Sequence, residues 1–331
     1  MSKSNGTENF AAVTGITLAI AAAALLAGNL AAPAPSASSG SQAGAASSIE
    51  LLASARESVS FADELLDPLS ARAQESSPVE VSGATVAPAK LADLDAAIRD
   101  IEAGGHDVGF LMLDVQTGVS VSYHADRSFY SASSIKGPYV ASVVSNVLGD
   151  AAQADGRVDA ILRYSDNDAY ASFRNEYGND PMQALVDASG AGLLPHAGIT
   201  DAVEAAAEPQ SGESIADNHY EFVTPAQMAA LWDQCRAFLG SDAPGAAWLA
   251  QEFQVPEVSS LSHVGRAWGT TWAKAGWYPD DASGYATTVD AGVVRTQKGD
   301  VVIVVMTTSP IDFPATASVI LPLLELHEQL G

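Results

Sequence analysis

The chain has 331 residues but a single cysteine, Cys235, which excludes an internal disulfide and any metal site built from several thiolates. Its six histidines include no pair at the His-x-His or His-x-x-x-His spacing typical of zinc ligands. We therefore expect no metal and no other cofactor. Cys235 lies in a stretch with a helical pattern, Met228-Ala229-Ala230-Leu231-Trp232, and is expected to be a buried core thiol.

Basic residues are also scarce, with 15 Lys and Arg against 40 Asp and Glu, a formal net charge of −25. So acidic a chain is repelled by nucleic acid and by anionic lipid surfaces, and both are excluded as electrostatic partners. Hydrophobic residues make up 47% of the chain, enough for one large domain or two modest ones with a real core.

Residues 10–32 form a nearly uninterrupted run of apolar and small residues, followed by Pro33-Ala34-Pro35-Ser36. This run predicts an export segment, either a cleaved secretory signal or a membrane anchor of roughly 20 residues. We favour an uncleaved anchor within residues 1–35, because prolines surround the candidate cleavage site. In either case the rest of the protein is expected outside the cytoplasm, with membrane contact through this segment only.

Residues 36–89 are predicted to connect the anchor to a catalytic domain over residues 90–331. The stretch 31–48 is rich in Ala, Pro, Ser and Gly without charges, as in a flexible tether. Residues 49–66 carry apolar residues at helical spacing and predict a stalk helix. A second polar and proline-containing stretch then continues to Ala89.

The predicted domain has an α+β pattern. It begins with an amphipathic helix from Leu91 that ends at Gly104-Gly105, and a mostly helical stretch spans 133–249 with a loop-rich middle at 189–220. A helix is predicted at 313–330. Strands are predicted at 108–114, 119–123, 270–276, 285–296 and 300–308. This order predicts an antiparallel β-sheet flanked by helices together with a helical subdomain.

Ser133-Ser134-Ile135-Lys136 places a hydroxyl and an amine three residues apart, on one face of a helix. A serine needs an adjacent base or cation to become a nucleophile. Lys136 can accept its proton only when neutral, a form that burial beside a second cation such as Lys274 would favour. The alternative is that these serines are ordinary helix caps. Pro138 requires the helix to be in its first turn at that point.

Two further motifs complete the chemical pattern. Ser165-Asp166-Asn167 precedes a helical start, where it is either a turn with an N-cap or a site in which Ser165 relays a proton and Asn167 donates a hydrogen bond to a substrate amide carbonyl. Lys274-Ala275-Gly276 lies on a predicted strand, either as part of the same site or as an edge strand with an exposed lysine.

In this order the three motifs resemble those of the class A β-lactamase and penicillin-binding serine hydrolase superfamily, over roughly residues 90–331. Thr224-Pro225-Ala226-Gln227-Met228 is similar to the Thr-Pro-x-x-Met stretch that follows the family's omega loop. The resemblance implies that Ser133 is the acylated nucleophile and Lys136 its activator. It also implies an oxyanion hole formed by the N–H groups of Ser133 and Trp277, and substrate binding by Asn167, Lys274, Ala275, Gly276 and Trp277.

The sequence departs from the family pattern at three places. Ala275 lacks the hydroxyl that helps to hold the substrate carboxylate, a hydrogen bond worth roughly 1.5–3 kcal/mol. The interval between the first two motifs is shorter than usual. The deacylating glutamate has a counterpart in Glu208-Pro209, but the asparagine expected four residues later is Gly212. Glu208 is therefore either the deacylation base or a solvated loop acid.

Three functions remain open from the sequence. The first is a β-lactamase-like serine hydrolase acting on a β-lactam or related amide, and the second is a cell-wall D,D-carboxypeptidase acting on peptidoglycan stem peptides. The third is a catalytically weak wall-associated module. Arg163 and Arg295 are candidate anchors for the substrate carboxylate.

Overall fold

The computed structural model describes residues 77–191, 222–280 and 283–330. The chain divides into two units, Met1–Ser77 and Pro78–Gly331, and the second contains nearly all described residues. The predicted anchor, tether and stalk helix, and Glu208, lie outside the described residues. No helix in the described ranges is long and apolar enough to cross a membrane.

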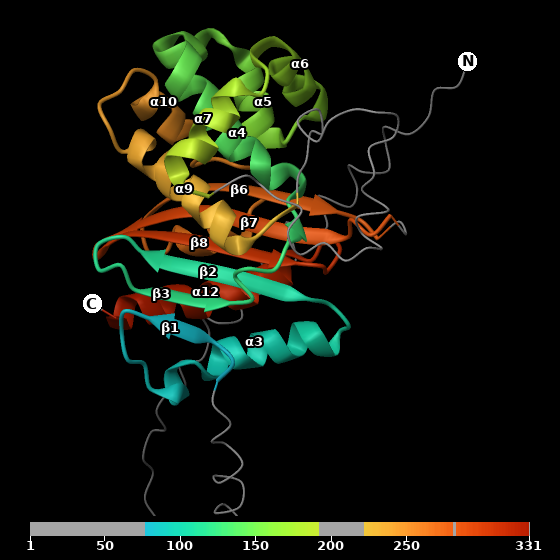
Figure 1. Cartoon of the computed structure of the whole chain (residues 1–331), viewed down its shortest axis with the longest axis vertical. Coiled ribbons are helices and arrows are strands. Elements are labelled where there is room, and N and C mark those ends of the chain that lie inside the picture. Colours follow the sequence, from blue (N-terminus) through green and yellow to red (C-terminus); the bar gives the residue numbers. More distant parts are fainter. Residues whose placement is uncertain (1–76, 192–221, 281–282, 331) are drawn as a thin grey trace, which may run out of the picture. The chain divides into compact units, whose positions relative to one another are not determined.

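Antiparallel strands form a six-stranded sheet in the order β1-β3-β2-β8-β7-β6 (Figure 1). The strands are β1 (Glu80–Ser82), β2 (Val108–Asp114), β3 (Ser120–Tyr123), β6 (Thr270–Tyr278), β7 (Thr287–Thr296) and β8 (Gly299–Thr307). The five predicted strands are confirmed as β2, β3, β6, β7 and β8. Two short strands, β4 (Phe129–Tyr130) and β5 (Phe222–Val223), pair separately beside this sheet.

The helices divide between the two faces of the sheet. Those nearest the chain ends are η1 (Pro88–Lys90), α3 (Ala92–Ala103), α11 (Ser260–Gly265) and α12 (Phe313–Leu330). The intervening segment contributes η2 (Ala132–Ile135), α4 (Lys136–Val143), η3 (Val144–Leu148), η4 (Gly149–Ala154), α5 (Gly156–Tyr164), α6 (Asn167–Tyr177), α7 (Asp180–Ser189), α9 (Pro225–Leu239) and α10 (Ala246–Glu252). These intervening helices form the predicted helical subdomain (Figure 1).

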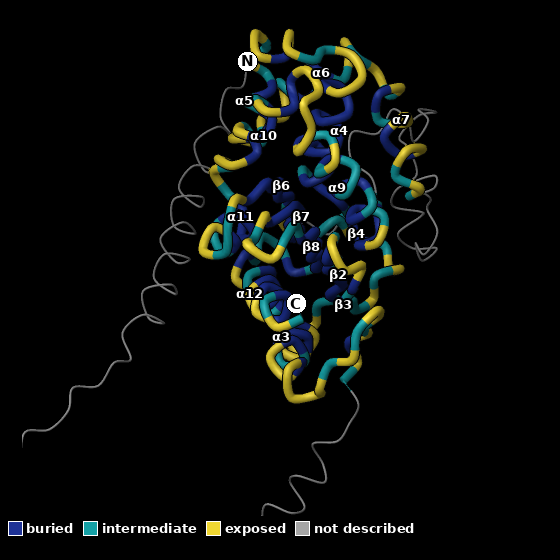
Figure 2. The backbone as a smooth tube through the Cα atoms, turned by 90° about the vertical axis from the view of Figure 1, so that its left-hand side faces the viewer, coloured by how far each residue is buried: buried dark blue, intermediate teal, exposed yellow. Residues whose placement is uncertain are grey.

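Strand β8 explains why helices cover both faces. Alternate residues of a strand point to opposite faces, and β8 is apolar on both. Val302, Val304 and Met306 pack with α4, α5 and α9 in one core, whereas Val301 and Ile303 pack with α3 and α12 in another. Figure 2 shows the sheet and the adjoining helix faces as buried.

Helix α9 joins the helical subdomain to the sheet, where it contacts β2, β7 and β8. It begins with a capping box, in which the Thr224 hydroxyl accepts from the Gln227 N–H and the Gln227 side chain accepts from the Thr224 N–H. Cys235 is buried within α9, as predicted, and burial raises the pKa of its thiol.

The α+β architecture predicted from the pattern is confirmed, but the sequence did not predict the short strands β1, β4 and β5. Strand β1 lies ten residues before the predicted domain start at Lys90, yet it pairs with β3 through Glu80–Ser82. Three residues carry too little periodicity to be recognised as a strand without their partner.

Candidate active site

Ser133 lies in η2, which continues directly into α4, so Ser133 and Lys136 are one helical turn apart. The preceding residue, Ala132, has a φ of 45°, in the left-handed region that costs a non-glycine residue roughly 1–2 kcal/mol. No side chain caps η2 or α4, so the structure does not support the helix-cap alternative for these serines. Ser133 is partly exposed, and no hydrogen bond joins its hydroxyl to another described residue.

Gly276 allows β6 to lie directly against the nucleophile segment. A Cβ atom at this position would lie 2.6 Å from the backbone nitrogen of Ser133 and 2.7 Å from the carbonyl oxygen of Ser131. Gly137 likewise allows α4 to lie close to β6, since a Cβ at Gly137 would lie 2.9 Å from the Cβ of Lys274. The two glycines bring the first and third motifs together.

Lys136 is fully buried and its amine contacts the second motif. Its Nζ donates to the carbonyl oxygen of Ser165 at 2.8 Å and to Oδ1 of Asn167 at 2.5 Å. Burial lowers the pKa of Lys136 to about 7, although the carboxylate of Asp166 acts in the opposite direction. A substantial neutral fraction at physiological pH makes this amine suitable as a general base.

Lys274 reaches the same motif from β6. Its Nζ donates to the Ser165 hydroxyl at 2.9 Å and to the carbonyl oxygen of Ala275 at 2.7 Å. Burial and the nearby Lys136 lower the pKa of Lys274 to about 7, and Asp290 opposes this shift. Lys274 is 2% exposed, so the alternative of an edge strand with an exposed lysine is wrong.

Ser165 is held between these two lysines by the end of a helix. It ends α5 with a φ of 59°, and the adjacent Asp166 caps α6 by accepting from the Ala169 N–H at 2.7 Å. Because the Ser165 hydroxyl accepts from Lys274, its own proton can be donated to another group. The turn and N-cap alternative is therefore confirmed for Asp166, and Ser165 in addition contacts both lysines.

The outer edge of β6 presents backbone donors. Among the described strands β6 pairs only with β7, and the Ala273 N–H instead donates to the carbonyl oxygen of Phe253, on the open side. In an antiparallel strand the N–H groups of alternate residues point to the same side. The Trp277 N–H therefore lies on the open edge, next to the segment that carries the Ser133 N–H.

Asp290 is a charged neighbour that sequence reasoning missed. It lies on β7 opposite Ala275, is fully buried, and accepts from the Ser259 hydroxyl at 2.9 Å and from the Leu261 N–H at 3.0 Å. Burial raises the pKa of Asp290 to about 6, against these hydrogen bonds and Lys274. The sequence did contain a signal for this residue, because Asp290 is the one acid within the largely apolar sequence of β7.

The side chain of Ala275 does not face this site. It shares a face of β6 with Ala273, which packs in the core beside α12, and only its carbonyl contacts Lys274. Glu208, the predicted deacylation base, lies outside the described residues.

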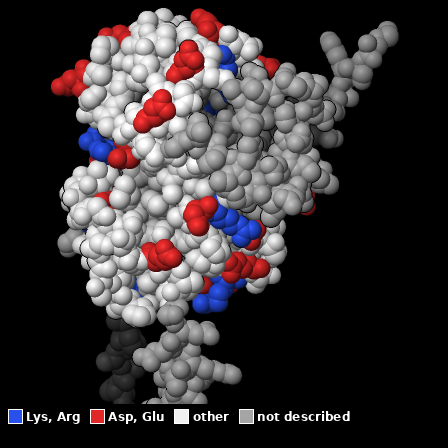
Figure 3. Space-filling model, in the orientation of Figure 1, with Lys and Arg blue, Asp and Glu red and all other residues white. Residues whose placement is uncertain are grey.

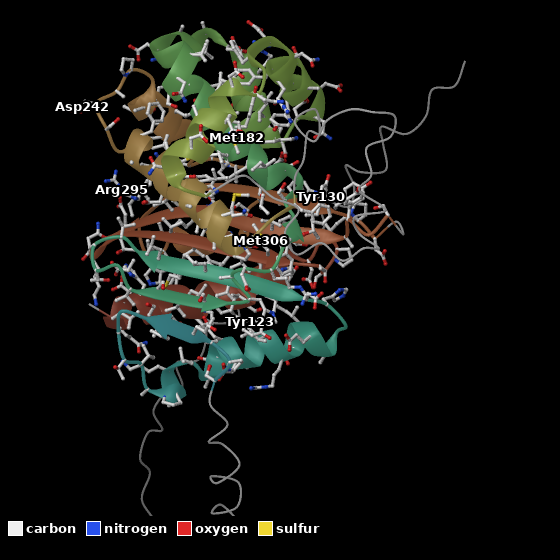
Figure 4. All side chains as sticks on the ribbon, viewed as in Figure 1. Tyr123, Tyr130, Met182, Asp242, Arg295 and Met306 are labelled. Carbon is white, nitrogen blue, oxygen red and sulfur yellow. The ribbon has the colours of Figure 1, made fainter. Side chains whose placement is uncertain are left out.

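The candidate carboxylate anchors lie at the other end of the sheet. Arg295 pairs with Thr270 across β6 and β7 and forms an ion pair with Asp300 at 3.1 Å. Figure 4 shows Arg295 and Tyr130, three residues before Ser133, at opposite ends of the sheet. Arg163 lines a cavity that also includes Thr270. Neither arginine lies beside the Gly276 end of β6.

Comparison with known families agrees with this arrangement. Residues 92–172 match the model of the beta-lactamase enzyme family, a range that contains the Ser133 and Ser165 motifs but not Lys274. No curated protein matches the chain's sequence.

Solved structures of β-lactamases share the fold. The β-lactamase of Sphaerobacter thermophilus superimposes with a TM-score of 0.52 at 19% identity, covering 72% of this chain and 96% of that one. A variant of the class A β-lactamase of the last common ancestor of Gram-negative bacteria gives 0.53 at 18% identity, covering 72% and 100%. A double mutant of that ancestor, bound to the transition-state analogue 5(6)-nitrobenzotriazole, gives 0.52 at 17% identity, covering 71% and 98%.

The fold and the three adjoining motifs define an α+β protein with a serine between two buried lysines. The chain has the fold of class A β-lactamases, and the resemblance to the β-lactamase/transpeptidase-like superfamily is confirmed.

Proposed function

We propose that this protein is a β-lactamase-like serine hydrolase that is acylated at Ser133 by a β-lactam or related amide and releases the product with water. The observation that supports this most is the chain of contacts from Lys136 through Ser165 to Lys274, beside Ser133. It provides a nucleophile, a base of lowered pKa and a proton donor in one place.

Acylation would begin with transfer of the Ser133 hydroxyl proton to neutral Lys136. The serine oxygen then forms a bond to the carbonyl carbon of the substrate, and the carbonyl oxygen becomes an oxyanion. The N–H groups of Ser133 and Trp277 would stabilise this charge, an interaction that typically contributes 10²–10³-fold to rate.

Collapse of this intermediate breaks the bond between carbon and the leaving nitrogen, which must gain a proton. The Ser165 hydroxyl can supply it and be reprotonated by Lys274, which donates to it at 2.9 Å. Lys136 holds the Asn167 side chain through its Oδ1, and the role proposed for the Asn167 amide N–H₂ is to donate a hydrogen bond to the substrate carbonyl.

Hydrolysis of the acyl-enzyme requires a base for the attacking water, and we assign this role to Glu208. The support is the position of Glu208 in the sequence: it lies 17 residues before Pro225 (225 − 208), the same interval that separates the Glu-Pro of the family from its Thr-Pro stretch.

The test is incubation with a chromogenic β-lactam, following turnover by absorbance and the adduct at Ser133 by intact mass. Ser133→Ala is expected to abolish both signals. Glu208→Gln is expected to retain acylation but accumulate the adduct, whereas the matched Glu204→Gln should behave as wild type.

The other outcomes separate the alternatives. A stable wild-type adduct without turnover would favour a D,D-carboxypeptidase acting on peptidoglycan stem peptides. No adduct with any β-lactam would exclude β-lactams as substrates and favour a catalytically weak wall-associated module or an unrelated acyl substrate.

We further propose that the protein works outside the cytoplasm, secreted or tethered to the membrane. The support is the apolar run of residues 10–32. Membrane fractionation with protease protection tests this, and recovery of the protein only from the cytosol would contradict it.

A further inference from the structure

A cavity lies away from the candidate active site described above. This cavity of about 930 Å³ is lined by the end of α5, the connection between α10 and α11, helix α11 and the start of β6. These elements gather on one side of the molecule in Figure 2. Thr270, in its wall, precedes Lys274 by four residues, or roughly 13 Å along the strand. The cavity is therefore separate from the lysine pair.

Two arginines line this cavity without ion pairs. Arg163 and Arg266 have no carboxylate within 4.0 Å among the described residues, whereas Arg127, Arg157, Arg236 and Arg295 all do. The exposed Arg99 on α3 also forms no ion pair with a described residue, so the distinguishing feature is that Arg163 and Arg266 line one cavity in a chain of net charge −25, whose carboxylates are spread over the face shown in Figure 3.

The guanidinium groups keep donors available. Arg266 uses its Nε to donate to the carbonyl oxygen of Ser262 at 3.0 Å, and the Arg163 guanidinium lies 5.4 Å from the centre of the Tyr164 ring. Free guanidinium N–H groups match carboxylate and phosphate oxygens, which they can bind in pairs.

The charged side chains that line the cavity are two arginines and one glutamate, a net charge of +1. Glu257 is its lining carboxylate, set against two arginines. Glu252 lies within electrostatic reach of Arg163 without forming an ion pair. His263 lies near Arg266, and burial together with that arginine lowers its pKa, which favours the neutral imidazole.

The lining also offers apolar contact and an unused hydroxyl. Tyr164 is 54% exposed and Val255 47%, two of the four large hydrophobic side chains exposed in the described ranges, and both line the cavity. The buried Thr271 hydroxyl, in the same wall, has no hydrogen-bond partner among the described residues. A cavity with an apolar wall and unpaired cations suits a ligand with both kinds of group.

We propose that this cavity binds a small organic anion, with its carboxylate or phosphate group on Arg163 and Arg266 and its apolar part against Tyr164 and Val255. Because Tyr164 directly precedes Ser165, the ligand would contact the helix end that holds the second motif. The site is nevertheless independent of acylation at Ser133.

The test uses the full chain carrying Ser133→Ala, so that acylation cannot contribute to the signal. Phenyl phosphate and benzoate are titrated by calorimetry, with neutral benzyl alcohol as the comparison. Arg163→Gln and Arg266→Gln should each weaken binding of at least one anion by about tenfold or more, because hydrogen bonds to charged groups are lost. Arg99→Gln, an exposed arginine on α3, should leave binding unchanged.

Preference for phenyl phosphate or for benzoate identifies the anionic group. The proposal would be overturned if the Ser133→Ala chain bound neither anion, or bound benzyl alcohol as tightly as the anions. It would also be overturned if this chain and its three arginine variants all bound the anions equally. Thermal unfolding of each variant verifies that the fold is retained. Since Ser133 is absent throughout, neither result bears on the proposed hydrolase activity.

Discussion

Lys136 and Lys274 lie on either side of Ser165, and each donates a hydrogen bond to it. Two buried amines so close to one another cannot both hold a proton without cost, because no solvent screens their repulsion. Burial lowers the pKa of both to about 7, so the pair changes its charge within the physiological range.

This residue-scale arrangement predicts the pH dependence of acylation. Lys136 acts as a base only when deprotonated, whereas Lys274 can reprotonate Ser165 only when protonated, so the acylation rate should be highest near pH 7 and fall on both sides. Lys136→Arg, which stays charged at all relevant pH values, should lower the rate by about 100-fold or more. Stopped-flow acylation between pH 5.5 and 8.5 measures both effects.

Lys90→Arg, an exposed lysine on η1, serves as the matched control and should follow the wild-type profile. A flat wild-type profile down to pH 5.5, or full activity in Lys136→Arg, would remove Lys136 from the role of base.

At the scale of elements, the site depends on how closely β6 approaches η2 and α4. Gly276 and Gly137 permit this approach because backbone and side-chain atoms of the neighbouring elements occupy the space where a Cβ would lie. The Lys-x-Gly spacing on a strand thus has a packing reason. Lys274 and Gly276 share one face, toward Ser133, while Ala275 faces the opposite core.

Gly276→Ala should therefore push β6 away from the Ser133 segment. We expect acylation to fall by at least about 100-fold, because a misplacement of about 1 Å at a reacting centre can cost that much. Gly156→Ala on α5 is the control, since a Cβ there meets nothing within 4 Å. Acylation kinetics and thermal unfolding are measured for both variants. Wild-type acylation in Gly276→Ala would contradict the predicted close packing.

At the scale of the whole molecule, the described fold begins before the predicted domain boundary. Strand β1 adds Glu80–Ser82 to the edge formed by β3, and Val79 is buried beside it. Within the unit Pro78–Gly331 the sheet separates two cores, and the candidate active site lies where the helical subdomain meets β6.

Truncation tests this boundary. A chain of residues 78–331 should unfold cooperatively and keep the acylation rate of the full protein. A chain of residues 90–331 should lose about 2 kcal/mol of unfolding free energy, because it lacks the buried Val79 and leaves β3 unpaired on one side. Urea denaturation of the two chains measures the difference, and equal midpoints with equal slopes would show that β1 contributes nothing.

The sequence by itself determined the element types and the three motifs. Strand alternation and helical spacing are local properties, so they predicted β2, β3, β6, β7, β8 and α12 and the α+β class. The order of the Ser133, Ser165 and Lys274 motifs likewise predicted the superfamily. The anchor, the tether and the role of Glu208 stay predictions.

Only the tertiary structure decided properties that depend on distant neighbours. Lys274 is buried, with the acid Asp290 behind it, because of the elements that pack around β6. The positions of Arg163 and Arg295, near Thr270 at the start of β6, likewise depend on which strand or helix packs beside them. The short strand β1 needed its partner β3 to be recognised. A pKa follows desolvation and neighbouring charge, which are set by contacts between residues far apart in the chain.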